Sequence, residues 1–247
     1  MIKTNVLRAS LKNDPSQPNR TTHEALSTKH MRSTTLPLDI ASALNTLSRG
    51  CEGIDTVMNT NKEENRFSRA LEALQSLSMA TEMPIAIVGG LAAIRYGYPA
   101  ATQDIDIAVC QVHLEPLIQV APQYGFKIAW ESKAGWHTLM HGDVEINIVP
   151  EGGKARDSSP TRIPSPRDMG VLQGVQYASI ESWVELKISS GRQKDRAHIV
   201  EVLKKSDDKS IAEIDRHLAN VDLTYQSAFK NLVAEAIEER HQEENRR

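Results

Sequence analysis

The segment QDIDIAV carries two residues whose types and spacing suit metal chemistry, Asp104 and Asp106. On a β-strand, residues two apart point to the same face, so both carboxylates lie side by side while Ile105 and Ile107 point the other way. Carboxylates placed in this way repel each other unless a proton or a cation offsets their charge. Mg²⁺ prefers one or two carboxylates together with substrate phosphates. The pair therefore indicates a site for Mg²⁺ or Mn²⁺, with a solvated polar edge strand as the alternative.

Two neighbouring segments extend this pattern. Gly89 and Gly90 close an apolar segment and precede a helical one. Glycines there let the backbone approach a phosphate, and a helix N-terminus offers free N–H groups, although an ordinary strand-to-helix turn is the alternative. Downstream, DVEINIVP alternates so that Glu145 and Asn147 share a face that can turn toward the aspartates. A phosphate cradle, paired carboxylates and a third polar strand are the layout expected for two-metal phosphoryl or nucleotidyl transfer.

A lysine further along the chain stands where an apolar residue is expected. Lys187 follows Ile180 by seven residues and so falls on the apolar stripe of the helix predicted there. A lysine turned toward a core needs an acidic or phosphate partner, and Asp195 can be that partner in a structural clasp. The alternative is a lysine whose ammonium group reaches solvent at the edge of the stripe. Arg192 and Lys194 either contact an anionic substrate or are solvated.

The hydrophobic pattern places these residues on an α/β core followed by helices. Strands are predicted at IAIVGG, QDIDIAV, FKIAWES, WHTLMH and DVEINIVP, and the alternation in FKIAWES puts Phe126, Ile128 and Trp130 on one face. Residues 151–170, rich in Gly, Pro and charge, are predicted to form a long loop. Helices are predicted over residues 63–83, 91–97, 113–123, 180–189, 194–204 and 210–218, and from residue 224 toward the end of the chain.

Three parts follow from this pattern. Residues 1–60 are rich in Asn, Ser, Thr and Pro without a sustained period, which predicts a weakly ordered leader. Residues 61–178 form the α/β core, and residues 179–247 form a helical C-terminal subdomain. The predicted fold class is α/β, with a mixed sheet flanked by helices.

Composition narrows the classes of function. The net charge of −3 disfavours broad binding to nucleic-acid phosphates, and the aromatic content of 4% disfavours a base-stacking surface for single strands. Cys51 and Cys110 match no metal or redox spacing and are interpreted as reduced thiols. No apolar run approaches the roughly 20 residues of a membrane span. The sequence therefore predicts a cytoplasmic protein with no membrane contact.

Four segments together resemble the nucleotidyltransferase superfamily, in particular compact members related to AbiEii-type toxins of abortive-infection systems. The resemblance covers residues 85–205 and rests on IVGGLAAIRYG, TQDIDIAV, INIVPEG and SIESWVELKISSGRQKDRAHIVEVL. It implies that the glycines and Thr102 contact a nucleotide, that Asp104 and Asp106 bind metal with a third carboxylate, and that the helical region with Lys187, Arg192 and Asp195 packs beside the site. Here Ala100 and Ala101 precede Thr102 where Arg is common, and His198 stands where Asp is common.

The third carboxylate is where this sequence departs most from the family pattern. Alignment puts Asn147 at its position, and an amide cannot act as a general base. Glu145 is two residues earlier on the same face, so we expect it to serve as catalytic and metal-binding residue if the strand register places it opposite Asp106. Asn147 would then contact substrate.

The function implied is Mg²⁺-dependent transfer of an NMP from an NTP to an acceptor hydroxyl. The acceptor can be an RNA or tRNA end, a protein or a small molecule, and an antitoxin partner is possible for a toxin-like member. The alternative is a catalytically silent binding or regulatory module of the same fold.

Overall fold

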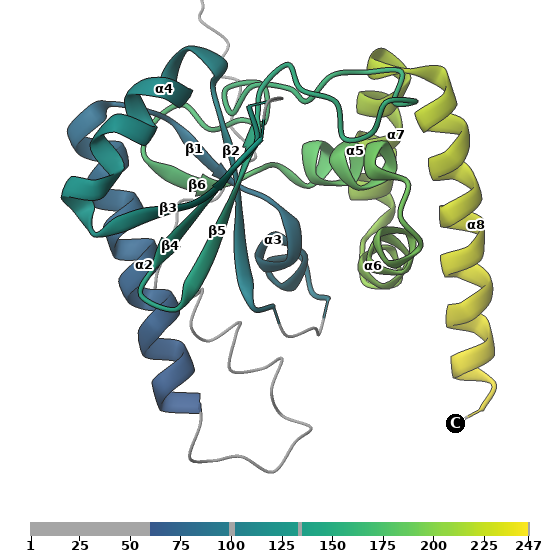
Figure 1. Ribbon diagram of the computed structural model, residues 1–247. Coiled ribbons are helices and arrows are strands. Elements are labelled where there is room, and N and C mark those ends of the chain that lie inside the picture. Colours follow the sequence, from purple (N-terminus) through teal and green to yellow (C-terminus); the bar gives the residue numbers. More distant parts are fainter. Residues whose placement is uncertain (1–59, 99–101, 133–134, 247) are drawn as a thin grey trace, which may run out of the picture. The chain divides into compact units, whose positions relative to one another are not determined.

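Asp104 and Asp106 lie on the second strand of a six-stranded mixed sheet (Figure 1). The computed structural model describes residues 60–98, 102–132 and 135–246, all within one unit that spans residues 33–247. The predicted leader, except for its last residue, lies outside the described residues. The strands follow the order β3-β4-β5-β2-β1-β6, with β2 parallel to β5 and β1 parallel to β6. They are β1 (Ile85–Ile87), β2 (Asp104–Val109), β3 (Phe126–Glu131), β4 (His137–His141), β5 (Val144–Pro150) and β6 (Val175–Tyr177).

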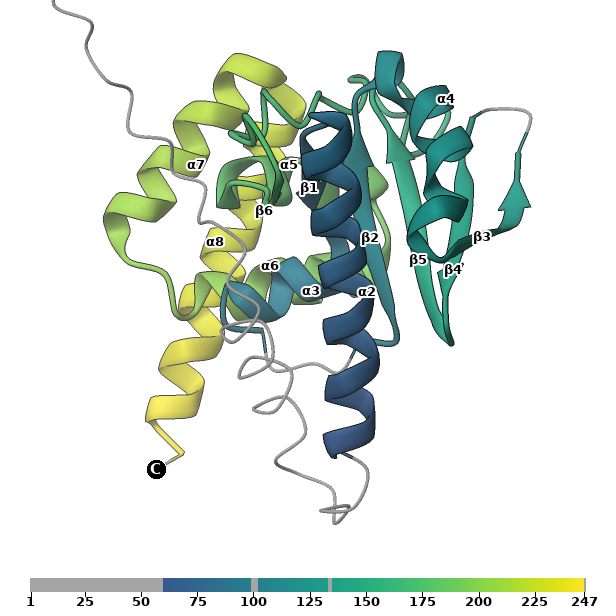
Figure 2. The ribbon, with the colours of Figure 1, turned by 90° about the vertical axis from the view of Figure 1, so that its left-hand side faces the viewer.

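Helices cover the sheet on both sides (Figures 1 and 2), so the predicted α/β class with a mixed, helix-flanked sheet is confirmed. On one face lie α2 and α4, whereas α5 to α8 pack against one another beside the other face. None of the described helices is both long and apolar enough to cross a bilayer. The helices are α2 (Thr60–Thr81), α3 (Gly89–Arg95), α4 (Gln111–Val120), a 3₁₀ turn (Ala121–Tyr124), α5 (Ile180–Ser190), α6 (Gln193–Leu203), α7 (Asp208–Val221) and α8 (Leu223–Glu244).

The two faces of β2 differ as the alternation predicts. Ile105 and Ile107 are fully buried in the main core, which also contains Leu71 of α2. The opposite face carries Asp104 and Asp106 and then Ala108, which belongs to a second apolar cluster. That cluster includes Ile163 and other residues of the segment between β5 and β6, so the predicted long loop, although it contains no helix or strand, is anchored to the sheet. The sheet thus holds the two carboxylates at the border of a buried apolar floor.

The helix that carries Lys187 begins as the sequence indicates. Ser179 is the N-cap of α5, and its Oγ accepts a hydrogen bond from the Ser182 amide at 3.3 Å. The helix ends at Gly191, which adopts a left-handed conformation with φ 63°. Arg192 is the N-cap of α6, so the segment that joins α5 and α6 brings Lys187 and Asp195 together.

Two features of the sheet differ from the sequence prediction. Strand β6 has only three residues, Val175–Tyr177, which is too short for a period to be recognised. In β3, the prediction that Phe126, Ile128 and Trp130 share a face is wrong for Trp130. The pairing with β4 shifts between Ile128 and Trp130, so that Ile128 pairs with Leu139 but Trp130 pairs with Thr138. A one-residue shift of this kind, a β-bulge, moves the following side chains to the other face.

Candidate active site

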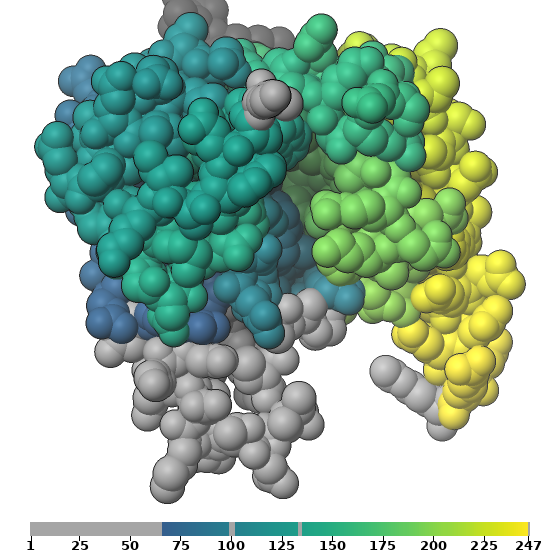
Figure 3. Space-filling model, in the orientation of Figure 1, coloured from purple at the N-terminus to yellow at the C-terminus, as the bar shows by residue number. Residues whose placement is uncertain are grey.

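A pocket of about 810 Å³ opens between the polar face of the sheet and the helices α5 and α6. In the space-filling view this region is the hollow between the teal strands and the green helices (Figure 3). The volume lies in the upper part of the range of ligand pockets, roughly 300–1,000 Å³. Of the sequence-predicted site residues, all but Glu145 line it: Gly89, Gly90, Thr102, Asp104, Asp106, Asn147, Lys187, Arg192 and Asp195.

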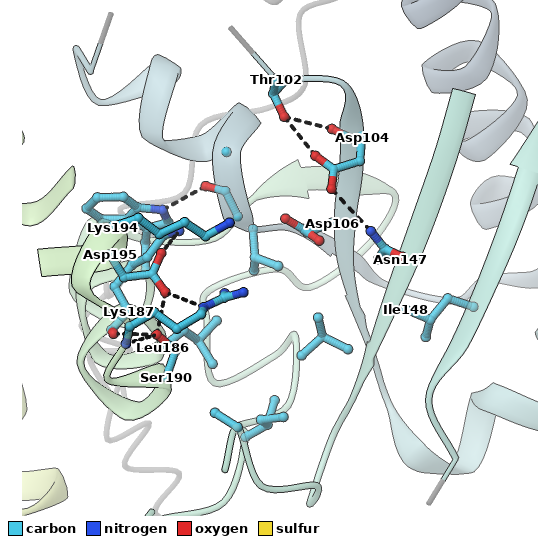
Figure 4. A pocket seen from close by; sticks show the side chains of 18 of the residues that line it. Thr102, Asp104, Asp106, Asn147, Ile148, Leu186, Lys187, Ser190, Lys194 and Asp195 are labelled. Atoms are coloured by element: carbon cyan, nitrogen blue, oxygen red, sulfur yellow. Dashed lines mark hydrogen bonds and ion pairs between the residues drawn. The ribbon is translucent and has the colours of Figure 1, made fainter. Parts of the chain in front are cut away.

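Asp104 is held by neutral donors on both sides. The Thr102 hydroxyl donates to its Oδ1 at 2.9 Å, and the Asn147 amide donates to its Oδ2 at 3.3 Å (Figure 4). Asn147 is itself oriented, because its Oδ1 accepts a hydrogen bond from the Thr138 hydroxyl at 3.0 Å. No ammonium or guanidinium group takes part in these contacts. The carboxylate is therefore fixed in direction while its charge is left to be offset by another group.

Asp106 lies directly against the glycine turn. Gly89 has φ +64°, and a Cβ built there would lie 1.8 Å from Asp106 Oδ2. A side chain at Gly89 and the Asp106 carboxylate cannot occupy this space together. The next glycine has a similar restriction, since a Cβ at Gly90 would lie 2.8 Å from the Thr102 hydroxyl. The absence of a side chain at both glycines thus makes room for Asp106 and Thr102, and both glycines line the pocket.

Burial raises the pKa of the Asp106 carboxyl, and the neighbouring Asp104 raises it further. Lys187 and Arg192 across the pocket and the Asn147 hydrogen bond act in the opposite direction but do not cancel the rise. A buried carboxylate beside another carboxylate gains from any cation that binds between them. Asp104 and Asp106 together therefore form a site where a bound cation is electrostatically favourable.

The strand register puts Asn147, not Glu145, opposite Asp106. In the parallel pairing of β2 with β5, Asp104 pairs with Glu145 and Asp106 pairs with Asn147. Glu145 shares the face of the two aspartates, but its side chain is exposed and does not line the pocket. The register condition under which Glu145 was expected to serve is therefore not met. The side chain that lies opposite Asp106 is therefore the amide of Asn147.

On the opposite wall, Asp195 is fully buried and surrounded by donors (Figure 4). Lys187, 8% exposed, donates from Nζ to Asp195 Oδ1 at 2.6 Å, so the expected pair between these two residues forms. Arg192 donates from Nε to Oδ2 at 2.8 Å, and the Ser190 hydroxyl also donates to Oδ2. Burial would raise the pKa of Asp195, but Lys187, Ser190 and Arg192 together outweigh it and hold the pKa below its usual value.

Two further basic residues line this wall. Lys194, which the sequence predicts either to contact an anionic substrate or to be solvated, lines the pocket, and Arg156, which the sequence does not indicate, lines it from the segment after β5. A Cβ at Gly191 would lie 2.0 Å from Nη1 of Arg156, so the glycine makes room for the guanidinium group. His198, whose pKa is lowered by burial and by Lys187, stacks on Tyr98 with ring centroids 4.4 Å apart. Nothing local in the sequence indicates that Arg156 faces α5, because a long loop has no periodicity.

All three tryptophans of the chain line the same pocket: Trp130, Trp136 and Trp183. Trp183 is fully buried, and its indole N–H donates to the Gly89 carbonyl at 3.1 Å, which ties α5 to the glycine turn. Trp130, in contrast, is 54% exposed. The low overall aromatic content gave no signal that the few aromatics gather at one place.

The residues present fit a divalent metal at Asp104 and Asp106, because two adjacent carboxylates line one pocket wall, neutral donors orient Asp104, and burial and Asp104 raise the pKa of Asp106. Elsewhere in the described part of the chain, Glu201, Glu239 and Glu243 also come together. Lys204 already donates to all three of these carboxylates and occupies the space between them, so part of their charge is offset without an ion.

No protein-family model matches the chain, and a search of curated proteins finds no match. Among solved structures, the chain is similar to nucleotidyltransferases. The antibiotic-resistance factor ANT(2'')-Ia is 13% identical, with 73% of this chain and 98% of that chain covered at a TM-score of 0.38. A CCA-adding enzyme is 14% identical, with 84% and 47% covered at 0.37. The STING-associated c-di-GMP synthase CdnE from Capnocytophaga granulosa is 11% identical, with 83% and 98% covered at 0.32.

Proposed function

We propose that the protein is a divalent-metal-dependent nucleotidyltransferase that moves an NMP from an NTP to an acceptor hydroxyl. One observation carries this proposal. Two carboxylates that lack a cation, Asp104 and Asp106, face Lys187, Arg192 and Lys194 across a single pocket. A nucleoside triphosphate with its metal is a ligand that has both the cation required on one wall and the negative charge required on the other.

Each residue has a role in this proposal. Asp104 and Asp106 hold the metal, Mg²⁺ or Mn²⁺, and when bound it would lower the pKa of the acceptor hydroxyl and offset charge on the leaving pyrophosphate. Thr102 and Asn147 keep the Asp104 carboxylate in position. Gly89 and Gly90, which line the pocket at the start of α3, let the triphosphate approach the backbone.

The opposite wall binds the phosphate chain. Arg192, Lys194 and Arg156 contact phosphate oxygens from the helical side of the pocket. Asp195 is a positioning residue, because both of its carboxylate oxygens are paired with Lys187 and Arg192 and it fixes both cations where the phosphates bind.

The transfer step replaces one bond at the α-phosphorus of the NTP by another. The acceptor oxygen forms a bond to the α-phosphorus of the NTP while the bond from that phosphorus to the oxygen shared with the β-phosphate breaks. Pyrophosphate leaves with the electron pair of that bond, and the hydroxyl proton passes to solvent. The chain's own contribution is to hold both reactants in line and to exclude water from the acceptor position.

A silent binding or regulatory module is the second candidate, and one observation favours it. Asn147 pairs with Asp106 at the position where a third carboxylate is expected, and its amide cannot accept the hydroxyl proton. Such a module would bind NTP and metal through the same residues without transfer.

The acceptor class is not fixed by the residues that bind the NTP. An RNA or tRNA end, a protein and a small molecule all remain candidates. The narrower resemblance to AbiEii-type toxins, an antitoxin partner and a cytoplasmic location also remain predictions.

The test combines binding with transfer. The protein is incubated with each of the four α-labelled NTPs, with Mg²⁺, Mn²⁺ or EDTA, and with total RNA, protein lysate or pooled small alcohols. We expect label transfer and pyrophosphate release only with metal, and loss of both in Asp104→Ala. Asp208→Ala, at an exposed position of α7, is the matched control. NTP binding without transfer in every condition would establish the silent module, and no metal-dependent NTP binding would overturn both candidates.

A further inference from the structure

The β-bulge in β3 places Trp130 in the same row of the sheet as the candidate metal ligands. Trp130 pairs with Thr138, Thr138 with Asn147, and Asn147 with Asp106. Paired residues of neighbouring strands share a face, so this row leads from Asp106 across β5 and β4 to the indole. With strands about 4.8 Å apart, the row is roughly 14 Å long. Without the register shift, Trp130 would follow Ile128 onto the opposite face.

Trp130 presents a large ring to the pocket rather than to the core. Its side chain is 54% exposed, although an indole is among the most favourable groups to bury. Trp136, which also lines the pocket, is half-buried against the second apolar cluster. The bulge and the exposed indole that it turns toward the pocket serve no purpose in the core. Both are accounted for if the ring binds a ligand that has a flat face.

The charges at this end of the pocket restrict what that ligand is. Of the residues that line this end of the pocket, Trp136, Thr138 and Asn147 are uncharged, and His137 has its Nε2 3.3 Å from Glu131. Among the described residues, the lysines and arginines that line the pocket come from α5, α6 or the segments beside them: Arg156, Lys187, Arg192 and Lys194. In the described part of the chain, no lysine or arginine therefore lines this end of the pocket to contact a polyphosphate or an RNA backbone.

A polycationic ligand is disfavoured for the complementary reason. The carboxylates that line the pocket are Asp104, Asp106 and Asp195. In the proposed function the first two hold metal, and the third is already paired with Lys187 and Arg192. No lining carboxylate in the described part of the chain remains to bind an ammonium group. The end of the pocket at β3 and β4 thus suits a neutral molecule.

We propose that Trp130 and Trp136 form the acceptor subsite, and that the acceptor is a small uncharged alcohol whose hydroxyl is carried on or beside a ring that presents a flat face. This inference rests on the proposed function. The ring stacks on the Trp130 indole, and the hydroxyl points along the Asn147 row toward Asp104 and Asp106. Its oxygen forms the bond to the α-phosphorus, pyrophosphate leaves with the electron pair of the broken bond, and the proton passes to solvent.

Two sources supply this chemistry, a nucleoside with its base and a neutral glycoside with its sugar ring, since both stack on indoles. Binding is measured by isothermal titration with adenosine and with methyl glucoside, in the presence and absence of Mg²⁺ and a non-hydrolysable NTP. Glycerol, spermidine and a short RNA serve as ringless, cationic and polyanionic comparisons. We expect one of the two ring alcohols to bind more tightly than all three comparisons.

The matched variants are Trp130→Ala, Trp130→Phe and Ile128→Ala. Ile128 lies on the same strand and is 50% exposed, but on the opposite face. We expect Trp130→Ala to weaken binding of the ring alcohol about tenfold, Trp130→Phe to restore most of it, and Ile128→Ala to leave it unchanged. Thermal unfolding of each variant separates lost binding from lost folding.

Three results would overturn the inference: no binding of either ring alcohol, tighter binding of spermidine or RNA, or unchanged binding in Trp130→Ala. Failure of the proposed function is distinguishable, because it is measured as absent metal-dependent NTP binding in the unaltered protein. Ring-alcohol binding that depends on Trp130 but occurs without any NTP binding would retain the site and reject the transfer reaction.

Discussion

Two acidic centres face each other across the pocket, and they are built in opposite ways. Asp195 is fully buried and accepts hydrogen bonds from Lys187, Ser190 and Arg192, so its pKa is lowered although burial acts to raise it. Asp106 is partly buried beside Asp104, and its pKa is raised. The first centre is electrostatically complete within the chain. The second is stable only to the extent that a proton or an external cation offsets its charge.

The contrast separates a structural carboxylate from a functional one by a physical criterion. Burial by itself does not distinguish them, because it acts to raise the pKa of both carboxyls, yet only that of Asp106 is raised. What differs is where the compensating charge comes from. Asp104 and Asp106 are held in place by neutral donors and by the close glycine turn. Their mutual repulsion destabilises the folded chain, and a bound cation relieves it.

The largest effect is expected at the acidic pair. Asp106→Asn removes one ligand charge while keeping the shape of the side chain, so the metal and the charge that develops on the phosphates lose their counterpart. We expect transfer to fall at least about 10³-fold, measured as label transfer at saturating Mg²⁺, while the circular dichroism spectrum stays that of the unaltered protein. Activity within a few-fold of normal would remove Asp106 from the site.

The next largest effect is a loss of folding stability, expected when the paired carboxylate of Asp195 is removed. Asp195→Asn leaves the Lys187 ammonium group buried without its counter-charge, and breaking a buried pair in this way costs about 3–5 kcal/mol. We expect a loss of that size in the free energy of unfolding, measured by urea denaturation. The double variant Lys187→Met with Asp195→Leu removes both charges and is the control, since it should recover most of the stability. If Asp195→Asn were as stable as the unaltered protein, the comparison between the two centres would fail.

A smaller change in folding stability, in this case a gain, is expected for Asp106→Asn in the metal-free protein. Since the folded pKa of Asp106 is raised, the folded state holds this proton more tightly than the unfolded state. The resulting stability is present below the unfolded pKa of about 3.9 and is lost as the pH rises through the folded pKa. At neutral pH, Asp106→Asn should therefore stabilise the metal-free protein by on the order of 1 kcal/mol.

The measurement is the thermal unfolding midpoint in EDTA and in Mg²⁺ from pH 4 to 8. Mg²⁺ should raise the midpoint of the unaltered protein and of Asp208→Asn, the matched surface control, but not that of Asp106→Asn. A midpoint for Asp106→Asn below that of the unaltered protein in EDTA would show that the carboxylate is compensated without metal.

Within each centre, the sequence predicts the arrangement of residues that are close in the chain. Lys187 on an apolar stripe requires a nearby partner, and Asp195 follows within one helix–turn–helix segment, so local periodicity is enough to pair them. The alternation in β2 likewise predicts which face carries Asp104 and Asp106. In both cases the interacting residues are close in the chain, where spacing fixes geometry.

The sequence fails where the geometry depends on pairing between distant strands. The register of β2 with β5 decides that Asn147 rather than Glu145 lies opposite Asp106, and no local pattern encodes a register. The bulge that turns Trp130 to the pocket is a second example, because plain alternation predicts the other face. Arg156 is a third, since its place beside Gly191 results from the packing of an aperiodic segment.

The smallest effect is expected at Glu145, where register and chemistry disagree. Glu145 is the carboxylate nearest in sequence to the position of a third metal ligand, yet it pairs with Asp104, is exposed, and does not line the pocket. Because strand residues two apart are separated by roughly 6.5 Å, the extra methylene of Glu does not bring it to the position of Asn147. We therefore expect Glu145→Gln to change transfer less than about twofold, as is usual for surface substitutions, in the same assay that detects the loss in Asp106→Asn.

Asn147→Asp is the informative partner, since it places a third carboxylate opposite Asp106 and should tighten Mg²⁺ binding while lowering stability in EDTA. A loss of transfer in Glu145→Gln comparable to that in Asp106→Asn would instead make Glu145 the third ligand. It would mean that the register of β5 against β2 shifts by two residues when substrate binds.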